Sequence, residues 1–205
     1  MTTGVSIVGS GHTQFGRLQE NLEELIVAAT REAVEDSGID PNDIDAVFLG
    51  HFNSGIVTDG FASSLILQAY PQLRFKPGMR AENACASGSA AIYAGMNMIR
   101  AGQARTVLVV GAEKMTSRST KEVTQALAGA GYQNDPAEAS LSFPQVFGVA
   151  ARDYDARYGS PLDAMAKIAV KNHANAMSNP LAHMHKEFTF EHCSTVSEMN
   201  PEIAP

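Results

Sequence analysis

Residues 81–91 read Ala81-Glu82-Asn83-Ala84-Cys85-Ala86-Ser87-Gly88-Ser89-Ala90-Ala91 and place a cysteine between two elements of different type. The residues before Cys85 end an expected β-strand, and the small residues after it favour the immediate start of an α-helix. A strand, a tight turn and a helix in this order are typical of a parallel α/β unit. The stretch therefore predicts an α/β fold with Cys85 in a turn at the start of a helix.

Two roles are open for Cys85 on physical grounds. The unpaired amides and the dipole at a helix start favour a thiolate, and the same amides stabilise an oxyanion on a carbonyl that the sulfur attacks. The small residues from Ser87 to Ala90 would leave room for an acyl thioester. A buried, unreactive cysteine beside a closely packed helix is the other role, and the local residues favour both about equally.

The chain around this stretch alternates expected strands with expected helices. Asn21 with Glu24 three residues later predicts a helix start, and Gly38 before Pro41 predicts its end. Nearly continuous apolar strands in this order indicate a mainly parallel sheet covered by helices on both faces. The expected strands are residues 5–9, 46–50, 80–83 and 106–111, and the expected helices are residues 22–33, 62–70 and 86–101.

The composition changes after Glu113. Residues 114–140 are rich in Thr, Ser, Gly and Ala and contain no clear strand. Two helical patterns follow, one over residues 144–158 and one that opens at Ser160-Pro161 and ends before Asn179-Pro180. We expect an α/β part over residues 1–113, an inserted, mostly helical domain over residues 114–193, and a return segment over residues 194–205.

The overall composition excludes several classes of protein. The chain has 205 residues, 44% of them hydrophobic, and a formal net charge of −7 from 15 Lys+Arg and 22 Asp+Glu. These values disfavour a disordered chain and a nucleic-acid binder. No apolar run approaches the ~18 residues of a membrane span. The two cysteines form no disulfide framework and the N-terminus carries no cationic targeting segment, so we expect a cytoplasmic protein.

Other motifs match common binding sites poorly. Gly9-Ser10-Gly11 is followed by Gln14, where a dinucleotide-binding fingerprint has its third glycine, and no Gly-x-Ser-x-Gly elbow occurs. A histidine-rich segment near the C-terminus lacks the pair-gap-pair spacing of a structural zinc site, so we expect a solvated loop and no metal there. Its potential ligands are His183, His185, His192 and Cys193.

Three segments resemble the thiolase superfamily. Asn83-Ala84-Cys85-Ala86-Ser87-Gly88 resembles its nucleophile motif, and Gly111-Ala112-Glu113-Lys114-Met115 resembles the segment after its fourth strand. Lys171-Asn172-His173 with Asn179-Pro180 resembles the sterol-carrier-protein-type thiolases. The resemblance implies a thiolase-like βαβαβ layered sheet with an inserted loop domain, over which coenzyme A lies, and hence an acyl-CoA acyltransferase.

The resemblance also implies roles for individual residues. Cys85 would take an acyl group from acyl-CoA as a thioester, which the deprotonated α-carbon of a second acyl-CoA attacks to give a 3-ketoacyl-CoA; degradation is the reverse. Asn83 and Gly88 would support the turn and the oxyanion, and Met115 and Phe147 would contact the substrate. Val146-Phe147-Gly148 stands where classical thiolases carry His-Met-Gly, which leaves the acyl-chain preference open. The coenzyme A thioester is the substrate, and no separate cofactor is implied.

The motifs of the second half of a thiolase do not occur in this sequence. Members of the family bring from that half a histidine that activates the cysteine and an acid/base cysteine, whereas Gly11-His12 is followed here by Thr13 and Cys193 by Ser194. We therefore expect the isolated chain to be a poor thiolase, since each such group contributes roughly 10²–10⁴ in rate.

Three interpretations of this half-length pattern stay open. The first is a truncated or split thiolase completed by a separate C-terminal half. The second is a thiolase-like acyltransferase subunit that works with a small thioester-binding subunit. The third is a noncatalytic half-thiolase that binds acyl-CoA or partners. In each case the resemblance implies a homodimer or tetramer.

Overall fold

The computed structural model describes residues 4–196, which divide into two compact units. Unit 1 comprises residues 4–13 and Arg17–Arg118, and unit 2 comprises Gln14–Gly16 and the residues from Ser119 onward. The division thus falls after Arg118, whereas the sequence places the domain boundary after Glu113. Most of the expected return segment, residues 197–205, lies outside the described residues, as do residues 1–3.

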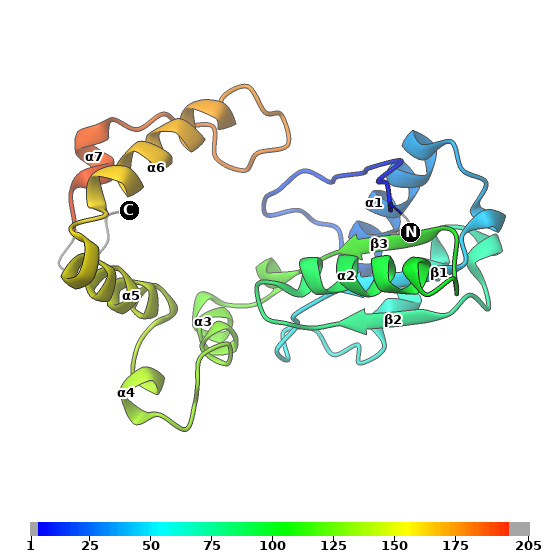
Figure 1. Ribbon diagram of the computed structural model, residues 1–205, viewed down its shortest axis with the longest axis horizontal. Coiled ribbons are helices and arrows are strands. Elements are labelled where there is room, and N and C mark those ends of the chain that lie inside the picture. The colour runs from blue at the N-terminus through cyan, green and yellow to red at the C-terminus, as the bar shows by residue number, and fades with distance from the viewer. Residues whose placement is uncertain (1–3, 197–205) are drawn as a thin grey trace. The chain divides into compact units, whose positions relative to one another are not determined.

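Unit 1 contains the expected alternation of helices and strands (Figure 1). Its regular elements are α1 (Leu22–Ser37), β1 (Ala46–Gly50), β2 (Gly78–Ala81), α2 (Ser87–Arg100) and β3 (Val107–Gly111). Short 3-10 helices connect them over Pro41–Asp43, Ala62–Gln68 and Pro71–Leu73, and another, Met115–Ser117, follows β3. The predicted helix at residues 62–70 is therefore a tighter 3-10 turn, and the predicted strand at 80–83 begins earlier and ends at Ala81.

The sheet of unit 1 is parallel throughout. In residues 4–196 it has three strands in the order β2-β1-β3, with Val47 opposite Gly78 on one side and opposite Leu108 on the other. The central strand β1 is completely buried, which its apolar sequence predicts. The parallel pairing confirms the expected α/β fold class.

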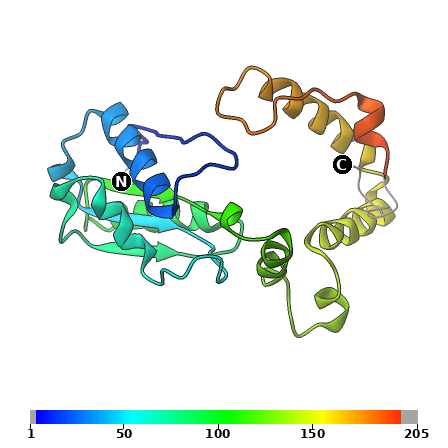
Figure 2. The same ribbon diagram turned by 180° about the vertical axis from the view of Figure 1, so that it is seen from behind.

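Successive residues of β1 face two different helical layers. Val47 and Leu49 lie in one buried cluster with α1 and the 3-10 helix Ala62–Gln68. Ala46 and Phe48 lie in another with Ala91 of α2. Figure 1 shows α2 across one face of the sheet, and Figure 2 shows α1 (blue) on the opposite face. Because side chains alternate along a strand, β1 packs against both helical layers. This packing on both faces holds the C-terminal end of β1 in place.

Helix α1 has the start and end that its sequence predicts. The side chain of Asn21 accepts the Glu24 amide at 2.9 Å, and the Glu24 carboxylate accepts the Asn21 amide at 2.8 Å. Gly38 ends the helix with a φ of 64°, a conformation that glycine adopts without a steric penalty. The capping box therefore fixes α1 before any tertiary contact is considered.

The strand predicted over residues 5–9 is wrong. This segment forms no strand and lies along α1, where the Ser10 amide donates to Asp36 at 2.8 Å and the His12 amide to Glu32 at 3.0 Å. Ile7 is 87% exposed. A strand needs a partner, and residues 5–9 pair with none of the three strands of the described sheet. The segment packs against α1 instead, so closely that a Cβ atom at Gly9 would lie 2.6 Å from the Ala33 carbonyl oxygen. Apolar composition alone therefore could not place this segment in the sheet.

Unit 2 is helical in its described part. Its helices are α3 (Thr120–Ala128), α4 (Pro136–Ala139), α5 (Phe143–Tyr158), α6 (Leu162–Ala176) and α7 (Phe190–Ser194). The expected helices over residues 144–158 and after Ser160-Pro161 correspond to α5 and α6. Helix α3 was not predicted, although Ser119 and Glu122 form a complete capping box at its start. No helix among residues 4–196 is both long and apolar enough to span a bilayer.

Candidate active site

Cys85 lies in a tight turn between β2 and α2. Asn83 and Cys85 form an isolated β-bridge, and the Ala86 amide donates to the Asn83 carbonyl at 2.9 Å. Ala84 has a φ of 45°, in the left-handed region, which costs a residue with a side chain about 1–2 kcal/mol. Backbone strain of this kind is often found at functional turns. The turn therefore presents Cys85 in a conformation that the surrounding contacts must hold.

Ser87 closes this turn from within. Its hydroxyl accepts the Asn83 amide at 2.9 Å and donates to the Ala84 carbonyl at 2.7 Å, and the Ser87 amide donates to the same carbonyl at 3.1 Å. Ser87 is buried, with 5% of its surface exposed. On the outer side, the Ala84 amide donates to the Glu82 carboxylate at 2.6 Å. These contacts fix both residues that precede the cysteine.

The first turn of α2 leaves backbone donors free. The N-cap residue Ala86 makes no side-chain capping bond, and within residues 4–196 the amides of Gly88 and Ser89 have no hydrogen-bond partner. Free amides and the positive end of a helix dipole stabilise negative charge. The arrangement can therefore stabilise a thiolate, or the oxyanion of a carbonyl under attack.

The two cysteines differ in access to solvent. Cys85 is exposed and Cys193, in α7, is 3% exposed; neither forms a disulfide. A thiol must be reachable to accept an acyl group from a soluble donor. Cys85 meets this condition, and Cys193 is an internal comparison for thiol reactivity.

The C-terminal ends of the strands support the cysteine turn. A Cβ atom at Gly50 would lie 2.7 Å from the Ser87 carbonyl oxygen and 2.8 Å from the Gly88 Cα, so the end of β1 abuts the start of α2. The next residue, His51, donates its amide to the Ala81 carbonyl at 3.2 Å, at the start of the turn. Gly50 and His51 thus contact both ends of the segment that carries Cys85.

A polar pair made of the buried His51 and the half-buried Glu113 lies at the same strand ends. His51 Nδ1 is 2.8 Å from the Ala112 carbonyl oxygen and 3.3 Å from Glu113 Oε1. Burial of the ring lowers the pKa of His51, but the hydrogen bonds to Glu113 and Ala112 and the Glu113 charge outweigh burial, and the net pKa is raised. Sequence analysis gave no role to His51 and named Glu113 only within the segment after the fourth expected strand. Their position after two parallel strands was the available signal, because such strand ends meet at one edge.

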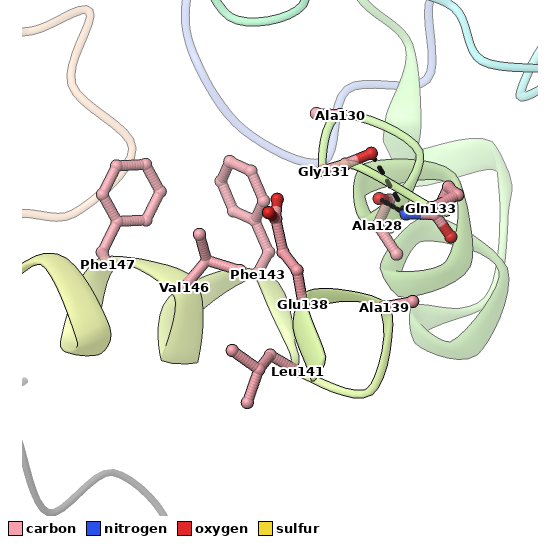
Figure 3. Close-up of a pocket in the computed structure, with 10 residues that line it drawn as sticks. All are labelled: Ala128, Ala130, Gly131, Gln133, Glu138, Ala139, Leu141, Phe143, Val146 and Phe147. Carbon is pink, nitrogen blue, oxygen red and sulfur yellow. Dashed lines mark hydrogen bonds between the residues drawn. The ribbon is translucent and has the colours of Figure 1, made fainter. Parts of the chain in front are cut away.

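Unit 2 holds a separate apolar pocket of ≈ 160 Å³ (Figure 3). Phe143 and Phe147 project from α5 on the same side, with ring centroids 5.2 Å apart in a T-shaped arrangement. Glu138 also lines the pocket, and its carboxylate accepts the Tyr132 amide at 2.9 Å. The remaining lining residues are Ala128, Ala130, Gly131, Gln133, Ala139, Leu141 and Val146. The pocket can accommodate a small apolar group.

The residues predicted for the site fall into three places. Cys85, Asn83 and Gly88 lie in the same turn and first helical turn of unit 1. Phe147 lines the unit 2 pocket and is 55% exposed. Met115 is half-buried in the 3-10 helix after β3 in unit 1 and does not line that pocket. The structure thus groups the turn residues and keeps the two expected substrate contacts on different units.

Two curated relatives share a name and cover most of this chain. The acetyl-CoA acetyltransferase of Methanothermobacter thermautotrophicus is 31% identical over 188 residues, which cover 91% of this chain and 49% of the relative. That of Methanocaldococcus jannaschii is 33% identical over 210 residues, which cover 95% and 53%. The chain therefore spans about half the length of these relatives.

A more distant relative and a solved structure extend the comparison. Sterol carrier protein 2 of Gallus gallus is 26% identical over 207 residues, covering 93% of this chain and 36% of the relative. The solved structure "Ltp2-ChsH2(DUF35) aldolase" superposes with a TM-score of 0.73 at 19% identity, covering 97% of this chain and 50% of that chain. At this identity the superposition shows a shared fold.

The family model of the thiolase N-terminal domain matches residues 5–192. This range includes the parallel sheet, the Cys85 turn and the helices of unit 2 up to α7. The resemblance of the cysteine motif and the fold thus agree with an independent match over nearly the whole sequence, and the chain belongs to the thiolase N-terminal domain family.

Proposed function

We propose that the chain accepts an acyl group from acyl-CoA as a thioester on Cys85, the first step of a thiolase reaction. The observation that carries this proposal is the Cys85 turn, in which an exposed thiol precedes a helix start with free amide donors. Membership of the thiolase N-terminal domain family supports it. So do the two relatives named acetyl-CoA acetyltransferase.

The chemistry of this step needs a nucleophile and a stabilised oxyanion. The Cys85 thiolate attacks the carbonyl carbon of the acyl-CoA thioester, and the carbonyl oxygen takes the negative charge. Collapse of this intermediate breaks the bond to the coenzyme A sulfur, which leaves as a thiolate and takes up a proton from solvent. The covalent thioester divides one substitution into two easier ones.

Four further residues support this step in our proposal. Asn83 and Gly88 hold the turn and stabilise the oxyanion, since Asn83 is bonded to Ser87 and the Gly88 amide is a free donor. Phe147 contacts the acyl chain, because it lines an apolar pocket. Met115 is a second substrate contact at the segment where β3 ends.

The same proposal assigns a role to each of three ranges of the chain. Residues 1–113 carry the nucleophile and residues 114–193 form the loop domain over which coenzyme A lies, with residues 194–205 as a return segment. Coenzyme A thioester is the substrate, and no resident cofactor is invoked. Two free cysteines fit the reducing cytoplasm, where we place the protein.

Full activation of Cys85 and the second step need groups that we assign to another half of the enzyme. In a Claisen condensation a base removes the α-proton of a second acyl-CoA, and the carbanion attacks the Cys85 thioester to give 3-ketoacyl-CoA. The acid/base motifs of the family do not occur in this sequence. We propose that a C-terminal half supplies them, in a homodimer or tetramer whose edge strand β2, paired on one side in the described sheet, is available for pairing.

A subunit in a larger assembly is the second candidate function. One relative, 27% identical over 188 residues, is named benzoylsuccinyl-CoA thiolase subunit BbsB and comes from Thauera aromatica. In that alternative the chain transfers acyl groups with a small thioester-binding partner and forms no 3-ketoacyl-CoA. A noncatalytic module that binds acyl-CoA predicts binding that does not depend on Cys85.

The release of coenzyme A tests the proposal. The purified chain is mixed with acetyl-CoA, and free coenzyme A is measured by chromatography against time. We expect a burst of one equivalent per chain, and no burst from Cys85→Ala. A Cys85→Ala variant that binds acetyl-CoA and still releases coenzyme A would reject Cys85 as the acceptor. Binding without a burst in either protein would favour the noncatalytic module.

A further inference from the structure

His51 and Glu113 form a polar pair that takes no part in the proposed acyl transfer. The His51 side chain is 1% exposed and that of Glu113 is 30% exposed. Glu113 Oε1 accepts the amide of Phe52 and, at 3.4 Å, that of Asn53. One carboxylate oxygen thus binds the His51 ring and the two backbone amides that follow it.

Two polar atoms of this pair lack partners. Within the described residues, His51 Nε2 and Glu113 Oε2 are buried and make no hydrogen bond. Buried polar groups without partners reduce stability, and a well-packed apolar pair in such a place is often more stable. The two unpartnered atoms reduce what this pair contributes to folding stability, and such groups mark candidate functional positions.

The pair lies where the three strands of the sheet end. His51 follows β1, donates its amide to Ala81 at the end of β2, and contacts Ala112 at the end of β3. Ala81 is also the residue from which the Cys85 turn departs, and Gly50, next to His51, abuts the residues that begin α2. A displacement of His51 would therefore move both ends of the turn.

We propose that the His51–Glu113 pair is a positioning device that holds the Cys85 turn in its strained, reactive conformation. The inference deepens the proposed function by naming two positioning residues for the nucleophile. The strain at Ala84, with its φ of 45°, requires surroundings that hold it, and the pair fixes the strand ends on which the turn rests. The charged groups that act on the ring are Glu113, which attracts its proton, and Arg80, which repels it.

If the pair holds the turn, the reactivity of Cys85 depends on whether His51 is protonated. Glu113 raises the pKa of His51, so the ring keeps its proton, and the pair its attraction, to a higher pH than an isolated histidine. Above that pKa the ring is neutral and the attraction is lost. The reactivity of Cys85 should therefore show an inflection as His51 titrates.

Alkylation of Cys85 tests the inference without acyl-CoA. Rates with iodoacetamide are measured by peptide mass spectrometry on the 205-residue chain, from about pH 5 to about pH 9. In Glu113→Gln we expect a roughly tenfold slower reaction and an inflection moved to lower pH, because the group that raises the pKa of His51 is gone. His51→Asn, whose amide can replace the Nδ1 donor to Ala112, should restore much of the rate but abolish the inflection.

A matched control exists at the opposite end of the sheet. The Asp45 carboxylate, before β1, accepts the amides of Arg105 and Thr106 before β3, at 2.7 and 3.1 Å. Asp45→Asn should weaken folding and leave the alkylation profile of Cys85 unchanged. Folded Glu113→Gln with the wild-type rate and profile would overturn the inference, and so would an equal change in Asp45→Asn. Failure of the proposed acyl transfer would instead appear as absent acetylation with this profile intact.

Discussion

The amide of Asn83 donates a 2.9 Å hydrogen bond to the hydroxyl of Ser87, and this bond closes the turn that carries Cys85. The same hydroxyl donates to the Ala84 carbonyl at 2.7 Å. One buried side chain thus joins the residues before the cysteine to the first residue of α2. The position of the thiol depends on this closure as well as on the strand ends beneath it.

Replacement of Ser87 by alanine should destabilise unit 1. The substitution removes the two hydrogen bonds of the buried Ser87 hydroxyl, from the Asn83 amide and to the Ala84 carbonyl, each of which contributes about 0.5–1.5 kcal/mol. Urea unfolding followed by circular dichroism measures the change. Ser64→Ala, which removes one hydrogen bond to the Phe61 carbonyl in a less buried place, should cost less. Equal losses in the two variants would contradict the closing role of Ser87.

Replacement of Gly50 by alanine should separate β1 from α2. Its Cβ would lie 2.7 to 2.8 Å from backbone atoms of Ser87 and Gly88, which cannot give way without moving the helix start. We expect a loss of about 1–3 kcal/mol, typical of overpacking, in urea unfolding. Gly111→Ala, at the end of β3 with open space around the added methyl, is the control. A Gly50→Ala chain as stable as Gly111→Ala would show that the two elements are not packed as described.

Replacement of Asp45 by asparagine should destabilise the fold in a pH-dependent manner. Hydrogen bonds from the backbone of Arg105 and Thr106 lower the pKa of Asp45 from its ordinary value of 3.8. The charged form is therefore favoured by folding, and its contribution is present above that value and lost as the pH falls through the lower, folded-state pKa.

Unfolding of wild type and Asp45→Asn at neutral pH and near pH 3 checks this sign. The stability difference should be present at neutral pH and should shrink in acid. Asp59→Asn, at an exposed position, is the comparison. A difference that stays constant across the two pH values would mean that the charge of Asp45 does not contribute.

Replacement of Phe147 by alanine should change the preference for acyl chains. If the unit 2 pocket holds the acyl group, a smaller side chain makes room for longer chains. We expect the ratio of octanoyl-CoA to acetyl-CoA acylation rates at Cys85 to rise roughly tenfold. Tyr158→Ala, on the same helix and outside the pocket lining, should leave the ratio unchanged. An unaltered ratio in Phe147→Ala would remove this residue from the substrate site.

The sequence predicts best those elements whose signals are local. The capping box at Asn21 and Glu24 and the glycine at position 38 mark both ends of α1, and the apolar run 46–50 is the central strand. Residues 5–9 have the composition of a strand but pair with no strand of the described sheet, because strand pairing depends on residues distant in sequence. Helix α3 was missed although its capping signal, Ser119 and Glu122, is present.

The candidate site likewise has parts that local sequence predicts and parts that only tertiary structure brings together. The Cys85 turn could be predicted because strand, cysteine and small residues are contiguous in the sequence. The His51–Glu113 pair joins residues on two different strand ends, and only the order β2-β1-β3 brings them together. The close approach of Gly50 to α2 is likewise a property of the packing. Local chemistry thus identified the thiol, and tertiary structure identified what holds it.

The most direct test of the central claim is the intact mass of the chain after incubation with acetyl-CoA, with peptide mapping of any adduct. The account predicts one acetyl group on Cys85, none on the buried Cys193, and no adduct on Cys85→Ala. An acetyl group that persists in Cys85→Ala would contradict it. So would a wild-type chain that stays unmodified while Cys85 reacts with iodoacetamide, because the thiol would then be accessible and still unable to accept an acyl group.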